Sequence, residues 1–141
     1  MSLPTKIQLH IVSPDRLLVN EPVDEVEIPG ADGYFGVLPG HTPLLGLLGA
    51  GELWYRQGQE KHYLLIAFGF VEVQPDRVSI LARIAEQPQE IDVARAESAK
   101  KRALERLSPQ APIDIDAERA RIALLKSLIR LQVASHARIR S

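Results

Sequence analysis

The sequence predicts an α+β protein in which an N-terminal antiparallel β-sandwich of about ten short strands precedes a C-terminal antiparallel two-helix hairpin. Two observations predict this class. Up to residue 89, apolar residues alternate with polar ones, and turn-forming residues interrupt the alternation. Beyond residue 89 the apolar residues recur at spacings of three and four, as they do on a helix. The predicted domains are therefore residues 1–89 and residues 90–141.

The strand pattern is clearest in three segments. In "KIQLHIV" the residues Ile7, Leu9 and Ile11 alternate with polar side chains, and "FVEVQ" and "RVSILA" repeat the pattern. Turn-forming stretches separate such runs, namely "SPD", "NEP", "PGADG", "RQGQE" and "QPD". Short alternating runs between turns indicate a sandwich or barrel of strands of about five residues each.

The first helix is expected to start at Asp92, whose carboxylate suits the N-cap position. Its apolar stripe consists of Ala96, Ala99, Ala103 and Leu107. Pro109 and Pro112 then interrupt the helical pattern. Because a buried alanine contributes little, whereas a buried leucine contributes about 1.5–3 kcal/mol, we expect this hairpin to be marginally stable by itself.

The second helix is expected to start at about Asp116. One face is predicted to carry Ile122, Leu125, Ile129 and Val133, with Leu124, Leu128 and Leu131 beside it. Since the connection between the helices is short, the two should lie side by side and antiparallel.

Composition separates the same two regions. Residues 1–89 carry six Lys and Arg against eleven Asp and Glu, whereas residues 90–141 carry eleven against seven, which gives net charges of −5 and +4. The 141 residues contain no cysteine, which excludes a disulfide scaffold and thiolate metal ligands. No signal-peptide pattern and no apolar run of membrane-spanning length is present, so we expect no direct membrane insertion.

Signatures of common enzyme sites are missing. The sequence has no GxxxxGK[ST], GxGxxG or GxSxG motif, and His10, His41, His62 and His136 are too widely separated to suggest a metal site. Asp24, Glu25 and Glu27 are a candidate acid–base set. However, Glu25 and Glu27 alternate with Val26 and Ile28, which is typical of the solvated face of a strand.

The segment "VEIPGADGYFGVLPGHTPLL" is the most specific feature of the sequence. Its glycines and prolines restrict the backbone around His41. This segment resembles the epsilon subunits of bacterial F-type ATP synthases, whose pattern is close to IPG..G..GVLPGH.PLL. The similarity continues in "IAFGFVEVQPDRVSILA", which is similar to GGFVEV..N.V.ILA, and in "IDVARAESAKKRALERL", which is similar to a helical IDxxRA motif.

This resemblance implies a non-catalytic rotor-stalk subunit that couples proton-driven ring rotation to ATP synthesis. The sandwich would bind the gamma subunit, with Trp54, Tyr55 and Phe70 as candidate contacts. It would also bind the membrane rotor ring through His41, Asp32 and Tyr34. Tyr34 stands where some relatives carry an acidic residue. The implied location is the cytoplasmic face of the bacterial inner membrane, where the chain would be peripheral through the complex.

The resemblance also implies a regulatory role for the hairpin. Its basic helices would reach the alpha and beta subunits of the catalytic head and inhibit ATP hydrolysis, and their charge makes that contact sensitive to salt. No cofactor is implied as a requirement, and ATP is implied as a regulatory ligand. The matching positions are Glu86, Ile91, Asp92, Arg95, Ala96, Arg102, Lys126 and Arg130. Lys126 replaces the arginine of ATP-binding relatives and lacks the planar fork that suits phosphate.

Simpler interpretations stay open for these features. Asp92 and Arg95 also suit a helix cap with a local ion pair, and His41 also suits a turn in which its ring bonds a nearby carbonyl. A stand-alone nucleotide-sensing module and a small hydrolase using Asp24, Glu25 and Glu27 are the alternatives to a rotor subunit. Nucleic-acid binding is disfavoured because the sandwich is acidic and aromatic residues do not interleave with the basic ones.

Overall fold

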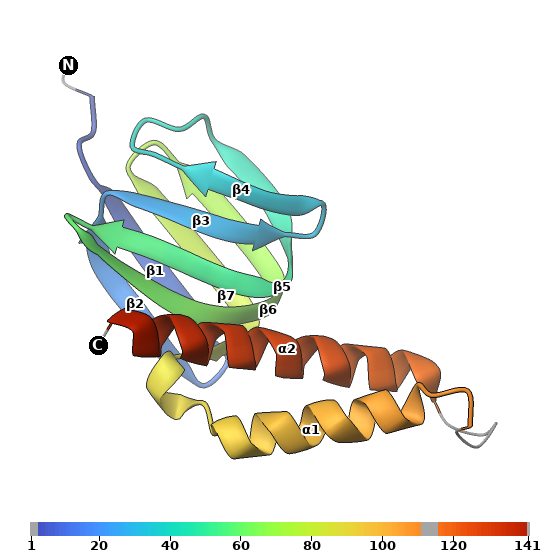
Figure 1. Ribbon diagram of the computed structural model, residues 1–141. Coiled ribbons are helices and arrows are strands. Elements are labelled where there is room, and N and C mark those ends of the chain that lie inside the picture. Colours follow the sequence, from blue (N-terminus) through green and yellow to red (C-terminus); the bar gives the residue numbers. More distant parts are fainter. Residues whose placement is uncertain (1–2, 111–115, 141) are drawn as a thin grey trace. The chain divides into compact units, whose positions relative to one another are not determined.

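The computed structural model describes residues 3–110 and 116–140, and the chain divides into two compact units, Met1–Gln87 and Pro88–Ser141. The first unit is built of strands and the second of helices (Figure 1). Pro112, one of the two predicted helix breakers, lies outside the described residues. The elements are β1 (Ile7–Ser13), β2 (Arg16–Val23), β3 (Glu25–Gly30), β4 (Gly33–Val37), β5 (Leu44–Gln57), β6 (Glu60–Gln74), β7 (Arg77–Glu86), the 3-10 helix η1 (Pro88–Glu90), α1 (Val93–Arg106) and α2 (Ala117–Arg140).

The strands form one continuous sheet in the order β2-β1-β7-β6-β5-β3-β4, which folds over on itself into a sandwich (Figure 1). The alternation predicted from the sequence is confirmed, because Ile7, Leu9 and Ile11 are fully buried between the layers. The inward positions of β6 and β7 join the same core, among them Val71 and Ile80. Branched aliphatic side chains therefore fill the sandwich, as suits strands with one buried face.

The prediction of about ten short strands was wrong in number, since the described residues form seven. β5 and β6 are 14 and 15 residues long, and each continues from one half of the sheet into the other. Phe68 marks the bend in β6, with φ 64°, and Gly69 follows with φ 119°. The inward positions change parity there, from Leu64 and Ile66 before the bend to Val71 after it. The apolar pattern looks interrupted in the sequence although hydrogen bonding continues through the bend.

One strand pair also departs from the antiparallel prediction. β1 pairs with β2 antiparallel but with β7 parallel, with Gln8 opposite Arg77 and Val12 opposite Leu81. All other neighbouring strands of the described sheet are antiparallel. Alternation reveals which face of a strand is buried but contains no information about strand direction, so this pairing was not predictable from the pattern.

Both helices start as predicted. The Asp92 carboxylate accepts a hydrogen bond from the N–H of Arg95 at 3.0 Å, and the Asp116 carboxylate accepts one from the N–H of Arg119 at 3.1 Å. Each cap satisfies a backbone donor that has no partner within its helix. α1 and α2 then run side by side in opposite directions, as Figure 1 shows. No helix among the described residues is both long enough and apolar enough to span a membrane.

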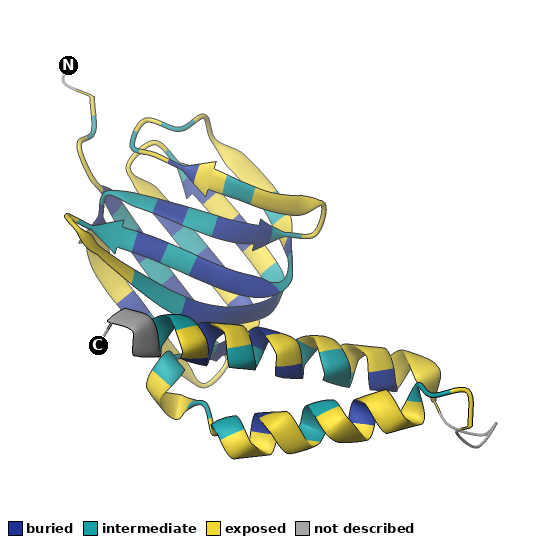
Figure 2. Ribbon diagram, in the orientation of Figure 1, coloured by how far each residue is buried: buried dark blue, intermediate teal, exposed yellow. Residues whose placement is uncertain are grey.

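The buried positions of α2 differ from the predicted face. Ile129 and Val133 are buried as expected, but Ile122 and Leu125 are exposed. Figure 2 shows buried, intermediate and exposed positions following one another along α2. Small side chains spaced seven residues apart take their place, at Ala120, Ser127 and Ala134 on α2 and at Ala96 and Ala103 on α1. Seven residues are two helical turns, so each set lies along one stripe. The prediction was wrong because it placed the largest apolar residues inside, whereas small residues allow helix backbones to approach closely.

Candidate functional site

An apolar row crosses the outer face of five neighbouring strands. The strand register aligns Leu47 of β5 with Phe70 of β6, Phe70 with Leu81 of β7, Leu81 with Val12 of β1, and Val12 with Leu17 of β2. Val12 is half-buried and the other four side chains are each more than half exposed. We call these five residues the apolar belt. With neighbouring strands about 4.8 Å apart, the belt is about 19 Å long.

A more polar row lies beside the belt. In the same strand order it consists of Leu45, Glu72, Ser79, His10 and Asn20. An exposed apolar strip bordered by polar side chains is typical of a protein interface, in which the strip is buried and the border stays wet. The geometry of this face therefore suits binding of another protein.

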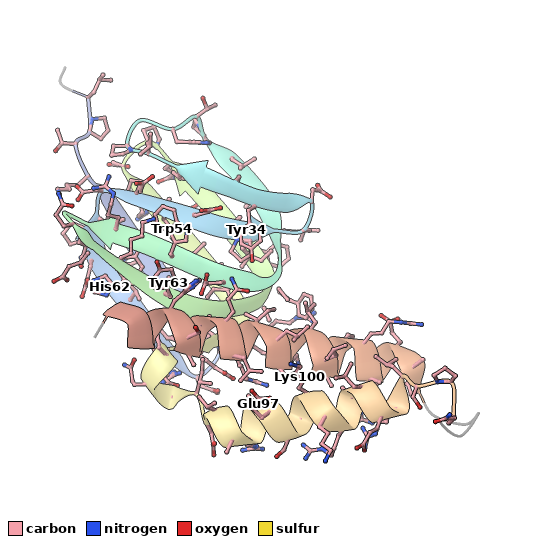
Figure 3. The ribbon with its side chains drawn as sticks, viewed as in Figure 1. Tyr34, Trp54, His62, Tyr63, Glu97 and Lys100 are labelled. Atoms are coloured by element: carbon pink, nitrogen blue, oxygen red, sulfur yellow. The ribbon has the colours of Figure 1, made fainter. Side chains whose placement is uncertain are left out.

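Sequence reasoning found only one belt residue. Of the three candidates for apolar contacts, Phe70 is exposed, Tyr55 is buried and stacks on His62, and Trp54 is half-buried with the Lys61 ammonium 4.1 Å from its ring centre (Figure 3). Apolar residues at outward positions, such as Leu81 beside Ser79, were the available signal. Only the register between strands shows that such residues form one row.

The loop between β4 and β5 carries His41. Gly40 has φ 86° and its N–H donates to the carbonyl of Pro75 at 2.7 Å, which ties the loop to the β6–β7 turn. The His41 N–H donates to the Leu38 carbonyl, and its ring Nδ1 lies 2.6 Å from the carbonyl oxygen of Thr42. Because a carbonyl only accepts, Nδ1 is the donor in this contact. His41 thus has the turn role that the sequence left open, on a loop fixed at Gly40.

The other two predicted ring contacts lie at the opposite end of β4 from His41. Asp32 is in the turn between β3 and β4, and Tyr34 is near the start of β4. Since β4 separates that turn from the His41 loop, the structure does not bring Asp32 and His41 together. The Tyr34 side chain is 54% exposed, but its hydroxyl oxygen accepts a hydrogen bond from the N–H of Glu52 at 3.1 Å (Figure 3).

The eight predicted nucleotide-binding positions fall into both units. Glu86 ends β7, whereas the others belong to the helical unit. Within that unit, Arg95 and Arg102 are exposed and lie seven residues apart along α1, so their guanidinium groups share a face. Lys126 and Arg130 lie one turn apart on α2 and are half-buried.

The remaining members of that set have structural roles. Asp92 is the N-cap of α1, Ala96 is buried, and the N–H of Ile91 donates to the Pro88 carbonyl at 3.1 Å. The simpler interpretation of Asp92 as a helix cap is therefore confirmed. The basic members of the set are Arg95 and Arg102 on α1 and Lys126 and Arg130 on α2.

Two of the three carboxylates considered for hydrolysis, Asp24 and Glu25, are held in ion pairs. Asp24 pairs with Lys6, accepts the N–H of Gly58 at 2.6 Å and lies 3.6 Å from Arg56. Glu25 accepts a hydrogen bond from Arg56 at 2.8 Å. The hydrogen bond from Lys6, with that from Gly58 and the charge of Arg56, lowers the pKa of Asp24, which is the opposite of what a general acid needs. In residues 3–110 and 116–140, no three His, Asp or Glu side chains gather as metal ligands.

Known proteins match both parts of the chain. The family described as "ATP synthase, Delta/Epsilon chain, beta-sandwich domain" matches residues 6–88, and "ATP synthase, Delta/Epsilon chain, long alpha-helix domain" matches residues 89–135. The ATP synthase epsilon chain of Koribacter versatilis is 51% identical over 74% of both chains. That of Solibacter usitatus is 44% identical over 94% of this chain and 98% of its own.

Solved structures agree with these matches. A chain in the mitochondrial ATP synthase of Euglena gracilis, solved as OSCP/F1/c-ring, is 28% identical, with a TM-score of 0.80 over 96% of this chain and 85% of its own. A chain from the central stalk and c-ring of Tetrahymena thermophila ATP synthase has a TM-score of 0.56 at 12% identity, which shows the shared fold alone.

A sandwich with an exposed apolar belt, followed by a basic helical hairpin, defines a subunit that works through contacts with other proteins. The family matches cover nearly the whole chain in the same order as the two units. The chain therefore belongs to the ATP synthase delta/epsilon chain family. Members of this family are stalk subunits of ATP synthase and not its catalytic subunits.

Proposed function

We propose that this chain couples rotation of the proton-driven membrane ring to ATP synthesis, as a rotor component at the cytoplasmic face of the bacterial inner membrane. In this proposal residues 1–89 make the mechanical contacts and residues 90–141 regulate the enzyme. The observation that carries the proposal is the apolar belt, because an exposed apolar strip on a folded sandwich calls for a permanent partner. The chain would be held at the membrane by the other subunits.

The belt is the proposed contact with the gamma subunit. Phe70 lies at its second position, between Leu47 and Leu81, and is the aromatic anchor that such interfaces favour. Burial of a phenylalanine contributes about 1.5–3 kcal/mol, which corresponds to a factor of about ten to one hundred in affinity. We therefore expect Phe70→Asp to weaken binding to gamma by at least tenfold.

A matched control comes from the polar row. Ser79→Asp places the same charge on β7, on the same outer face and one outward position from Leu81. It should leave gamma binding within about threefold of the unchanged chain, since border residues contribute little. Copurification and titration with the alpha–beta–gamma core measure both variants. Equal losses for Phe70→Asp and Ser79→Asp would mean that the belt is not the contact.

The ring contact is proposed at the β4–β5 loop that carries His41, with Asp32 and Tyr34 at the other end of β4 as further candidates. The supporting observation is that Gly40 and the His41 turn are tied by hydrogen bonds, so the loop can transmit force without rearranging. In the assembled enzyme, His41→Ala should reduce ATP-driven proton pumping while the rate of ATP hydrolysis is kept. Unchanged pumping would contradict a coupling role for His41.

The helical hairpin is the proposed brake on ATP hydrolysis. Exposed leucines on both helices, including Leu104 and Leu125, give it an apolar surface suited to a second binding partner, and its net charge of +4 suits acidic loops of the catalytic head. ATP hydrolysis by the alpha–beta–gamma core should be suppressed by the full-length chain but not by a truncation ending at Gln89. Equal rates of ATP hydrolysis with both bound forms would contradict the proposed inhibition by the hairpin but not the proposed rotor role.

ATP is the proposed regulatory ligand of the hairpin. Support comes from Arg95 and Arg102, which are exposed on one face of α1 and can meet a polyphosphate together. Calorimetric titration of the full-length chain with ATP should give binding that Arg102→Ala weakens and Lys101→Ala does not, because Lys101 points from a different face. Absence of binding by the unchanged chain would contradict the proposal.

A further inference from the structure

The edge strand β4 has little support from the sheet. It lies at one end of the strand order, and within the described sheet it pairs with β3 alone. It is five residues long and two of these, Gly33 and Gly36, are glycines. A short, glycine-rich edge strand opens easily because few backbone hydrogen bonds hold it. The turn before it carries Asp32, which is one of the proposed ring contacts.

The ladder between β3 and β5 is interrupted next to this strand. Glu27 pairs with Trp54, but the next pair is Gly30 with Leu48, so the register shifts by three residues. Pro29 lies inside the interruption and has no N–H to donate. The N–H of Glu52 lies on the β5 side of the same interruption, and Glu52 is only 6% exposed. A donor at a buried residue needs a partner from the protein.

Tyr34 supplies that partner from β4. Its hydroxyl oxygen lies 3.1 Å from the Glu52 nitrogen, so the side chain crosses β3 and reaches β5 (Figure 3). The residue beneath it is Gly51. A Cβ atom at position 51 would come within 2.2 Å of the Tyr34 hydroxyl oxygen and 2.9 Å of the Pro29 side chain. The contact therefore requires both a hydroxyl on residue 34 and a glycine at residue 51.

We infer that Tyr34 is a positioning residue, whose hydroxyl ties β4 to β5 across β3 and thereby fixes the β3–β4 turn for contact with the ring. This inference rests on the ring contact proposed above. The Tyr34 side chain is 54% exposed, but its hydroxyl is fixed by the hydrogen bond from the N–H of Glu52. Through this tie, Tyr34 controls where the turn between β3 and β4 presents Asp32.

Hydrogen exchange of the full-length chain tests the tie without any partner. Tyr34→Phe removes the hydroxyl and keeps the ring, so the amides of Glu52 and of β4 should exchange about tenfold faster. Amides in the β5–β6 turn around Gly58 should not change and serve as an internal control. Gly51→Ala should have the same effect by displacing the tyrosine. Unchanged exchange in Tyr34→Phe would overturn the inference.

Proton pumping by the assembled enzyme tests the consequence. We expect Tyr34→Phe to lower the protons pumped per ATP hydrolysed, in the same direction as Asp32→Ala. If exchange is faster in Tyr34→Phe but pumping is unaffected while Asp32→Ala lowers it, the positioning role is overturned and the ring contact survives. If neither variant affects pumping, the proposed contact of this turn with the ring fails instead, and only the tie itself is supported.

Discussion

The sandwich and the hairpin bury different kinds of side chain. Inside the sandwich, large aliphatic residues such as Ile28, Leu53 and Ile66 are completely buried. In the hairpin, small residues such as Ala103 and Ala120 are buried while Leu125 is 42% exposed. Because burial energy scales with apolar area, we expect the sandwich to be stable by itself and the hairpin to be only weakly stable. The difference suits a rigid coupling part joined to a part that can exchange partners.

The largest effect should separate a buried leucine of the sandwich from an exposed leucine of the hairpin. Leu53→Ala in the sandwich should lower the free energy of unfolding by about 2–5 kcal/mol, since it removes buried methyl groups and leaves a cavity. Leu125→Ala in the hairpin should cost less than about 1 kcal/mol because its side chain already contacts water. Urea denaturation followed by circular dichroism measures both. Similar costs would contradict the comparison.

The next effect concerns strain inside the rigid unit. A non-glycine residue in the left-handed region costs about 1–2 kcal/mol, and Phe68 is in that region. Phe68→Gly should therefore be more stable than Phe68→Ala by about 1 kcal/mol. At Val71, where the backbone is ordinary for a strand, the order should be reversed, with glycine less stable than alanine. If denaturation experiments find glycine less stable than alanine at residue 68 as well, Phe68 is unstrained.

A smaller effect is expected at the start of the hairpin. Asp92→Ala removes the N-cap of α1 and should cost about 1 kcal/mol of local stability. The loss should appear as faster hydrogen exchange in the first turn of α1, with protection of the sandwich strands unchanged. Asp92→Asn, which keeps an accepting oxygen, is the control and should restore most of the protection. Loss of protection in the sandwich would mean that the two units do not unfold separately.

The smallest effect is expected at Asp24. Its pKa lies below the ordinary value of 3.8, mainly because of the hydrogen bond from Lys6. A lowered folded-state pKa stabilises the protein above about pH 3.8, and this stabilisation is lost as the pH falls through the folded value. Asp24→Asn should therefore be less stable at pH 7, and the difference should close below pH 3.8. Asp15→Asn, in the β1–β2 turn, is the control, and a gap that is independent of pH would contradict this account.

Elements that depend on neighbouring residues were predictable from the sequence. Ile7, Leu9 and Ile11 alternate and are buried, and Asp92 precedes a helix and caps it. These features depend on the two-residue period of a strand and on backbone donors only a few residues away. Both can be seen directly in the sequence.

Features that depend on register were not predictable. The apolar belt exists because five strands align Leu17, Leu81 and Leu47 with their neighbours, and the tie at Tyr34 exists because the β3–β5 ladder shifts at Pro29. The buried stripe of α2 was missed for a similar reason. Which residues form this stripe depends on the distance between the two helix axes. Ala120 and Ser127 allow the helices to approach, but their presence in the sequence does not show that they do.

The parallel pairing of β1 with β7 has a consequence for biosynthesis. β1 is made first, yet its partner along one edge, beginning at Arg77, lies 69 residues after Gln8. Until β7 has been synthesised, one edge of β1 has no strand to bond, and such edges are prone to aggregation. Long-range pairing of this kind also slows folding, whereas the helical contacts are local. Completion of the sandwich therefore has to wait for its last strand, and the hairpin is the part of the chain that leaves the ribosome afterwards.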